Sequence, residues 1–140
     1  MKNLFAVFDT NVLVSSLMSR REDSPTVVLL DYVLDGDIVL LYNDEILQEY
    51  TEVLHRDKFE FSEERIEAVM AMVATGLRLE RTPSGEVFPD ADDAVFYEVA
   101  LSKEDSYLVT GNQRHFPKSP IVVTPAEMLE IVRNSKSINV

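Results

Sequence analysis

The sequence of 140 residues contains no cysteine, and this absence removes several classes of site. Without cysteine there is no disulfide framework, no zinc–thiolate cluster and no thiolate nucleophile. The chain also lacks any apolar run near the roughly 18 residues that a membrane-spanning helix needs. The apolar stretch at its start is too short for a secretory signal peptide and has no cleavage-like site after it. We therefore expect a soluble, cytoplasmic domain with no membrane contact.

Basic residues are also scarce, since 13 Lys and Arg stand against 25 Asp and Glu, which gives a formal net charge of −12. Such a chain is not expected to bind nucleic acid by phosphate neutralisation alone. A nucleic-acid enzyme remains compatible with this charge, because bound divalent cations change the local field at a site. An acidic surface also suits a basic protein partner.

Short apolar runs alternate with segments of helical periodicity along the whole chain. The apolar runs predict strands at residues 4–8, 37–42, 77–81, 106–110 and 121–123. Periodicity, with capping and stop signals, predicts helices at residues 12–19, 24–36, 43–57, 62–76, 92–103 and 125–135. The Pro-, Gly- and Asp-rich segment 81–93 is expected to be a loop within one domain that spans residues 1–140. Residues 134–140 are expected to form a frayed tail.

Strands that alternate with helices predict right-handed crossovers and helices on both faces of a sheet. We therefore expect the α/β class, as a three-layer α/β/α sandwich with a mostly parallel central sheet of about five strands. Ligands of such sheets bind beyond the carboxyl ends of the strands. Asp9 follows the first predicted strand directly, so we expect it at that edge.

Asp9 interrupts an otherwise apolar stretch, and a buried acid is costly unless it is paired, hydrogen-bonded or bound to metal. Two interpretations are open at this point. Asp9 is either the N-cap of the next helix or part of a site at the sheet edge. The adjacent Thr10 and Asn11 fit both, because they can cap a helix or hydrogen-bond a metal's water.

The helix predicted over 43–57 carries three acids, Glu45, Glu49 and Glu52. Helical geometry places Glu49 at the edge of the apolar stripe, whereas the other two turn further toward water. Glu49 is thus the acid best placed to reach inward, and the alternative is a solvated helix flank.

Three further acids, Asp90, Asp92 and Asp93, stand at the start of the helix predicted over 92–103. Acids there cap free amides and complement the helix dipole, which explains one or two of them. Three within four positions exceed what capping needs. Hard oxygen ligands at a helix end suit Mg²⁺ or Mn²⁺.

The strand predicted over 106–110 ends in Thr110, Gly111 and Asn112. The glycine permits a tight turn, and the other two offer neutral oxygens at the same edge of the sheet. Arg114 and His115 are the basic residues nearest in sequence. For His115, a packed or surface position competes with a minor role as a general base.

A doubly wound topology brings four candidates from separate segments to one edge, namely Asp9, Glu49, Asp93 and Asn112. Gathered carboxylates repel one another and raise each other's pKa unless a cation is present. A divalent ion relieves this repulsion, activates water and shields a phosphate.

These residues lie in four stretches that resemble PIN-domain nucleases, especially the bacterial toxin-like (VapC-type) branch. The stretches are FDTNVLVSSLM (8–18), LQEYTEVLHRDKF (47–59), DADDAVFYEVA (90–100) and YLVTGNQRHFP (107–117). The resemblance implies an α/β/α fold and Mg²⁺- or Mn²⁺-dependent endoribonuclease activity on RNA. It further implies a homodimer and the role of toxin in a toxin–antitoxin pair, neutralised by a cognate antitoxin.

Matched position by position, the family's first acid falls on Asp9, its helical Glu on Glu49 and its helix-opening acid on Asp93. The resemblance thus implies that these three hold the metal and that Asn112 stands where the family usually has a fourth acid. A neutral amide still holds a metal-bound water but weakens a second metal position, for which Asp90 or Asp92 could compensate. The side chains expected to order water or phosphate are Thr10, Asn11, Thr110 and Asn112, and those expected to steer RNA are Arg20, Arg21 and Arg114.

Three other interpretations compete with this one. An aspartyl-phosphate phosphatase needs a second Asp where this chain has Asn11, and a receiver-like domain needs a Lys after the strand over 106–110. Both are disfavoured. The third is a PIN-like fold with an incomplete metal site that acts as a non-catalytic protein- or RNA-binding module, and Asn112 keeps it open.

Overall fold

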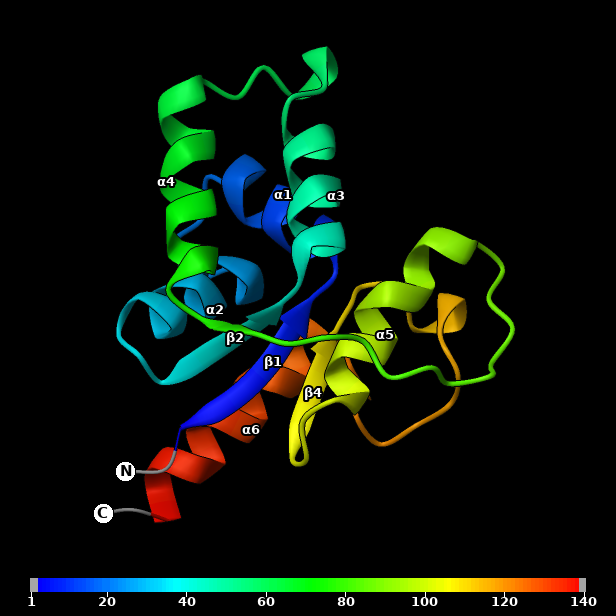
Figure 1. Ribbon diagram of the computed structural model, residues 1–140. Coiled ribbons are helices and arrows are strands. Elements are labelled where there is room, and N and C mark those ends of the chain that lie inside the picture. Colours follow the sequence, from blue (N-terminus) through cyan, green and yellow to red (C-terminus); the bar gives the residue numbers. More distant parts are fainter. Residues whose placement is uncertain (1–2, 139–140) are drawn as a thin grey trace.

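The computed structural model describes residues 3–138, and its centre is a five-stranded, all-parallel sheet with strand order β3-β2-β1-β4-β5 (Figure 1). The strands are β1 (Leu4–Phe8), β2 (Ile38–Tyr42), β3 (Leu77–Arg78), β4 (Ser106–Val109) and β5 (Val122–Val123). The predicted α/β class and the predicted parallel sheet are confirmed.

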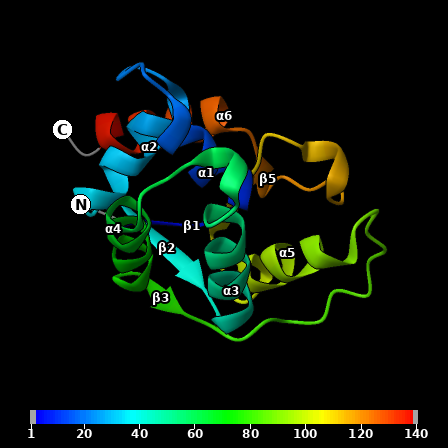
Figure 2. The ribbon, with the colours of Figure 1, turned by 90° about the horizontal axis from the view of Figure 1, so that it is seen from above.

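Six α-helices occur in the described residues and cover both faces of the sheet (Figure 2). They are α1 (Thr10–Met18), α2 (Pro25–Leu34), α3 (Asp44–Leu54), α4 (Glu63–Ala74), α5 (Ala94–Leu101) and α6 (Pro125–Ile138). Helices α1, α2 and α6 lie on one face and α3 and α5 on the other, while α4 packs on α3 and β2. Across residues 3–138, none of these helices combines the length and the apolar character that crossing a bilayer requires.

The third strand is shorter than predicted, because it contains two residues where the alternating pattern over 77–81 predicted five. The Leu79 amide still donates to the Tyr42 carbonyl at 2.8 Å. Beyond this point Arg81 reaches Glu45 and Glu98, and the chain leaves the sheet edge to cover α5. These side-chain contacts draw the chain away from β2 and so end the strand. The alternating pattern of the sequence contains no sign of them.

Helix α6 is longer than predicted and runs through residues expected to form a frayed tail. It begins with a capping box, in which the Glu127 amide donates to Thr124 Oγ1 at 3.1 Å and the Thr124 amide donates to Glu127 Oε1 at 2.8 Å. Near its end, Lys136 Nζ lies 2.9 Å from Asp37 Oδ2, a contact that holds the last turns against the rest of the fold. The part of the predicted tail at 139–140 lies outside the described residues.

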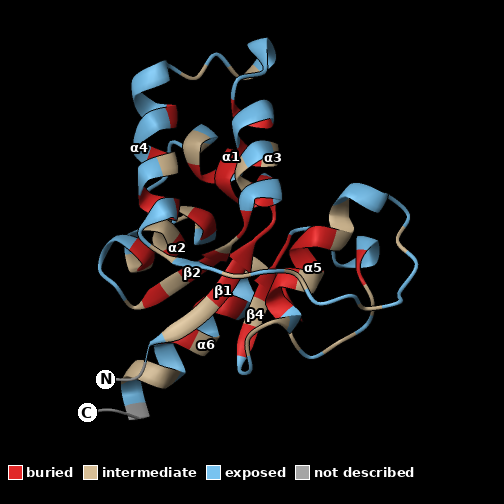
Figure 3. Ribbon diagram, in the orientation of Figure 1, coloured by how far each residue is buried: buried red, intermediate tan, exposed pale blue. Residues whose placement is uncertain are grey.

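The buried core lies between the sheet and the helices that cover it, and both contribute to it (Figure 3). In β1, Ala6, Val7 and Phe8 are fully buried, as expected for a strand covered by helices on both faces. After α4 the chain passes so close to β2 that a Cβ on Gly76 would stand 2.0 Å from the Leu40 carbonyl oxygen. Only glycine fits that approach without moving the backbone.

The strand order reverses between β1 and β4, because β2 and β3 lie on one side of β1 while β4 and β5 lie on the other. Phe8 and Val109 are register partners at the carboxyl ends of these strands. The next residues, Asp9 and Thr110, therefore lie beside the reversal point, which is where open α/β sheets bind ligands.

Candidate metal and substrate site

Asp9 lies at the reversal point as an almost fully buried acid, with 7% of its surface exposed. Its amide donates to the Val109 carbonyl at 2.9 Å, and its carboxylate oxygen Oδ2 accepts a hydrogen bond from Thr110 Oγ1 at 2.8 Å. Asp9 occupies the N-cap position of α1, but its side chain makes no capping bond there. The Asp9 carboxylate is therefore hydrogen-bonded to the sheet edge through Thr110 and makes no side-chain capping bond to α1.

Burial raises the pKa of the Asp9 carboxyl, while the hydrogen bonds from Thr110 and the Thr10 backbone, together with the nearby His115, act in the opposite direction. The ionised form is therefore held in a poorly hydrated position by few donors. A cation at this edge would stabilise it.

Asp93 is the second acid of the site and is half-buried, with 18% of its side chain exposed. It ends the 3₁₀ turn η2 (Ala91–Asp93), directly before α5, and makes no side-chain capping bond. Burial, followed by the charges of Asp9 and Asp90, raises its pKa to about 6, although His115 Nδ1 lies 3.5 Å from its Oδ2 and lowers it. Asp9 and Asp93 are thus electrostatically coupled across the reversal point.

Of the three acids before α5, Asp90 takes the capping role, because its Oδ1 accepts from the Asp92 amide at 2.9 Å. Sequence reasoning predicted that capping would use one or two of the three. Asp93 is the acid left without a capping bond that couples to Asp9.

Glu49 on α3 is half-buried and faces the turn η2. Partial burial raises the pKa of Glu49, and the charges of Glu52, Asp92 and Asp90 raise it further, against an opposing effect of Arg56. Glu49 and Asp92 line the same hollow of about 260 Å³. Glu49 and Asp92 therefore belong to one acidic surface.

The predicted acids do not form one compact cluster. Within residues 3–138, no group of three or more His, Asp or Glu side chains is arranged to hold a metal ion. The structure couples Asp9 to Asp93 and Glu49 to Asp92, and Asp90 influences both Asp93 and Glu49. The acids, which we expected to meet in one cluster, thus form a chain in which neighbouring carboxylates influence each other's pKa.

The donor chemistry at the reversal point nevertheless fits a hard divalent cation. Mg²⁺ commonly keeps several waters and is held by only one or two carboxylates. Asp9 and Asp93 supply two. The next residue, Thr10, carries in its Oγ1 the one buried side-chain polar atom in the described part of the chain without a hydrogen-bond partner. A buried hydroxyl without a partner is costly, so a ligand or its water would relieve it.

The remaining predicted residues differ in their positions. Thr110 is fully buried. Its Oγ1 donates to the Asp9 carboxylate and accepts from the backbone amide of Asn112 at 3.0 Å. The side chains of Asn11, Asn112 and Arg114 are exposed. Asn112 opens the 3₁₀ turn η3 (Gln113–His115) without a side-chain capping bond, so its amide group is open to solvent at the same edge.

Sequence reasoning missed a structural role for Tyr50, which it assigned only to the apolar stripe of α3. Tyr50 is buried, and its hydroxyl donates to the carbonyl of Phe8, the residue before Asp9. Burial and the charge of Asp9 raise its pKa. A tyrosine in an apolar stripe signals such a role, because its buried hydroxyl must find a partner.

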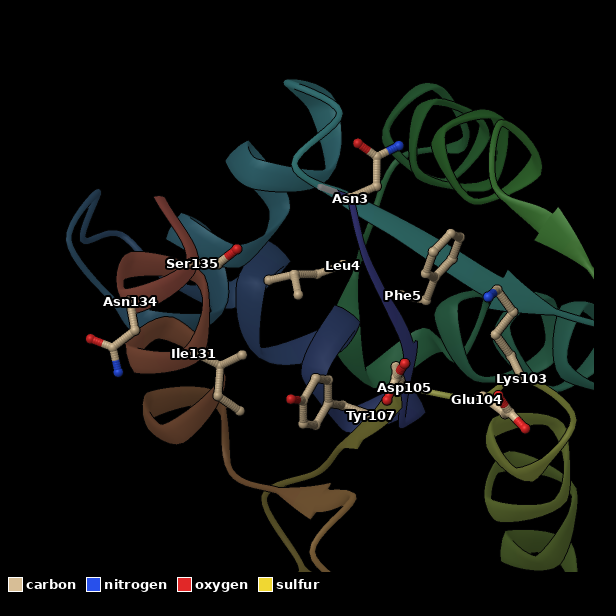
Figure 4. A pocket seen from close by; sticks show the side chains of 10 residues that line it. All are labelled: Asn3, Leu4, Phe5, Lys103, Glu104, Asp105, Tyr107, Ile131, Asn134 and Ser135. Atoms are coloured by element: carbon tan, nitrogen blue, oxygen red, sulfur yellow. The ribbon is translucent and has the colours of Figure 1, made fainter. Parts of the chain in front are cut away.

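Another hollow, of about 500 Å³, lies away from this site at the amino ends of β1 and β4 (Figure 4). Phe5 and Tyr107 contribute to its wall, and Lys103 Nζ lies 4.2 Å from the centroid of the Phe5 ring. It contains none of the predicted site residues, so its size does not make it the functional centre.

Comparison with known proteins gave one result that bears on the fold and the site. A family model described as PIN domain matches residues 6–114, which include Asp9, Glu49, Asp93 and Asn112. PIN domains are generally nucleases. No curated protein and no solved structure matched the chain.

Proposed function

The chain belongs to the PIN-domain family, and on that premise we propose that it is a divalent-metal-dependent endoribonuclease. The observation that carries the proposal is the position of the buried Asp9 and the half-buried Asp93 where the strand order reverses, with Thr110 hydrogen-bonded to the first and His115 beside the second. Isolated buried acids are destabilising, so a pair of them indicates a site at which a cation compensates.

Asp9 and Asp93 would hold Mg²⁺ or Mn²⁺, with Glu49 as the third acid on the rim. When bound, such an ion polarises a phosphodiester and favours the ionised form of a coordinated water. Thr110 keeps the Asp9 carboxylate oriented through its 2.8 Å hydrogen bond. His115, 3.5 Å from Asp93, holds that carboxylate from the other side.

The neutral groups around these acids would order water and substrate. Thr10 contributes an unpartnered buried hydroxyl, and Asn11 and Asn112 offer exposed amides at the same edge. Asn112 stands in place of an acid, so we assign it to water or phosphate rather than to the metal. Arg114 would contact a phosphate of the RNA.

The biological role we propose is that of a cytoplasmic toxin in a toxin–antitoxin pair, acting as a homodimer. This part follows from the resemblance to the toxin-like branch. Exposed apolar side chains support this role, because such side chains occur in protein interfaces. Examples are Leu34, which is 69% exposed, and Met18, which is 58% exposed.

A second candidate function is a non-catalytic module that binds protein or RNA. Two observations favour it: Asn112 replaces an acid, and the described residues contain no ready group of three metal-binding side chains. The two functions differ in whether a metal-dependent product appears.

Cleavage of a fluorescent single-stranded RNA, with Mg²⁺, with Mn²⁺ or with EDTA, separates the two. We expect cleavage that needs the metal and is lost in Asp9→Asn and Asp93→Asn. Asp105→Asn is the matched control, because Asp105 precedes β4 at the opposite edge and its left-handed φ of 59° is one that Asn accepts. Absence of cleavage by the parent under every metal condition would support the binding module instead.

A further inference from the structure

The chain after β4 differs in charge from the rest of the molecule. No Asp or Glu occurs from Ser106 to Ala126, although the chain has 25 such residues in total. The charged side chains of this stretch are Arg114 and Lys118, both exposed. A segment that contributes no acid of its own thus lies beside the acidic site of a strongly acidic protein.

Arg114 and Lys118 are also unusual among the cations of this protein. In residues 3–138, most Lys and Arg side chains contact a carboxylate, a carbonyl oxygen or an aromatic ring. The cations of this part of the chain that have no such partner are Arg20, Arg114 and Lys118. Two of these three therefore stand in the acid-free stretch, with their charges available to an anion.

Two adjoining hollows follow this segment. One, of about 410 Å³, is lined by residues 111–115, and the other, of about 490 Å³, has Lys118, Pro117 and Val122 in its wall. Gln113 and Arg114 line both, so Arg114 stands between them. No acid lines either hollow.

Contacts of Phe116 and Gln113 hold this segment in place. Phe116 is buried, and its ring packs edge-on against Phe88 with ring centroids 6.2 Å apart. Gln113 Nε2 donates to the Val122 carbonyl at 3.1 Å and to Glu127 Oε1 at 3.2 Å. A backbone fixed in this way loses little conformational entropy when the surface binds a ligand.

The segment is joined directly to the candidate site. Thr110 Oγ1 donates a hydrogen bond to the Asp9 carboxylate and accepts one from the backbone amide of Asn112. His115 contacts Asp93 at 3.5 Å. A phosphate chain that lies along the hollows would therefore continue into the space beside Asp9 and Asp93.

We propose that residues 112–119 form a phosphate-binding surface that holds the backbone of single-stranded RNA beside the candidate site, with Arg114 and Lys118 each neutralising one phosphate. The inference rests on the proposed function, because it places the substrate of that reaction. Guanidinium and ammonium groups suit phosphates. Single-stranded RNA fits better than a protein, because the aromatic side chain of this surface is buried and no exposed apolar anchor is offered.

The test is the salt dependence of RNA binding, measured by fluorescence anisotropy on a labelled strand of about 12 nucleotides in EDTA. Each neutralised phosphate contributes about 0.7 to the slope of log affinity against log salt for a single strand. Arg114→Gln with Lys118→Gln should therefore lower the slope by about 1.4 and weaken binding about tenfold or more at low salt. The double variant Lys103→Gln with Arg133→Gln changes the net charge equally, away from this surface, and should keep the parent's slope.

Two competitors identify the kind of ligand at constant ionic strength. Inorganic phosphate and poly-glutamate should displace the RNA poorly. The proposal is overturned if free phosphate displaces RNA at low millimolar concentration, if poly-glutamate binds as tightly as RNA, or if the two double variants behave alike. Arg114, Lys118 and Arg133 are exposed and Lys103 is half-buried, so circular dichroism and melting are measured for both double variants, and unchanged curves will show that they are folded.

A cleavage assay run in parallel separates this proposal from the proposed function. A parent that cleaves RNA, together with a surface variant that binds and cleaves like the control, would overturn the surface and leave the nuclease intact. A parent that never cleaves, together with a surface variant of reduced slope, would support the surface and contradict the nuclease.

Discussion

Replacing Asp93 by Asn should stabilise the metal-free protein. In the folded state the pKa of Asp93 is raised from 3.8 to about 6, by burial first and then by the charges of Asp9 and Asp90. A difference of one pKa unit corresponds to about 1.4 kcal/mol, so the ionised side chain costs at most about 3 kcal/mol at neutral pH. Solvent reaches part of the side chain, of which 18% is exposed, and we therefore expect a gain of about 1 to 2 kcal/mol.

The raised pKa of Asp93 determines how the stability of the protein changes with pH. For an acid whose pKa is higher in the folded than in the unfolded state, protonation favours folding, and stability falls as the pH rises from about 4 to 6. Above this pH range Asp93 is fully ionised, and the full free-energy cost of its burial is present. The advantage of Asp93→Asn should therefore be largest near pH 7.5 and should shrink to about a third near pH 4.5.

Thermal and urea unfolding in EDTA at both pH values measure the effect. A gain of about 1 to 2 kcal/mol corresponds to a rise of about 3 to 8 °C in melting temperature for a chain of this size. Asp105→Asn removes the same charge at the opposite edge of the sheet and serves as the control. The reasoning is wrong if Asp93→Asn is less stable than the parent at pH 7.5, or if its advantage does not change with pH.

Three further variants test the scaffold. Tyr50→Phe leaves the buried carbonyl of Phe8 without its donor and should lower the unfolding free energy by about 1 to 3 kcal/mol in urea; no change would mean that the hydroxyl does not support the end of β1. Gly76→Ala brings a methyl group against the Leu40 carbonyl oxygen and should reduce the yield of folded protein or lower the melting temperature strongly, and a variant as stable as the parent would contradict the close approach. Asn43→Ala removes the side-chain cap of α3 and should cost about 1 kcal/mol, measured by calorimetry, whereas a loss near zero would show that the cap is dispensable.

The fold was largely predictable because its signals are local. The run at Leu4–Phe8 is apolar throughout, as expected for a strand buried on both faces, and Asn43 and Ser62 supply the N-caps of the helices predicted over 43–57 and 62–76. The end of β3 was not predictable. Arg81 bridges Glu45 and Glu98, which lie far from it in the sequence, and a pattern of alternation carries no information about such contacts.

The candidate site was predictable in its location and less so in its arrangement. The position of Asp9 follows from a strand end in a parallel sheet. The pairing of Asp9 with Asp93, and of Glu49 with Asp92, depends on how far α3 and η2 lean over the sheet edge. Helical spacing identifies the face on which Glu49 lies but not the distance to its neighbours, so one compact cluster was expected where a chain of coupled acids is found.

Calorimetric titration of Mn²⁺ into the parent and into Asp9→Asn, Asp93→Asn and Asp105→Asn tests most directly whether the acids at the strand reversal act together on a cation. The parent and Asp105→Asn should bind the ion with the same affinity, and the other two variants should lose most of that binding. Equal Mn²⁺ affinity in all four proteins would contradict a shared site of Asp9 and Asp93.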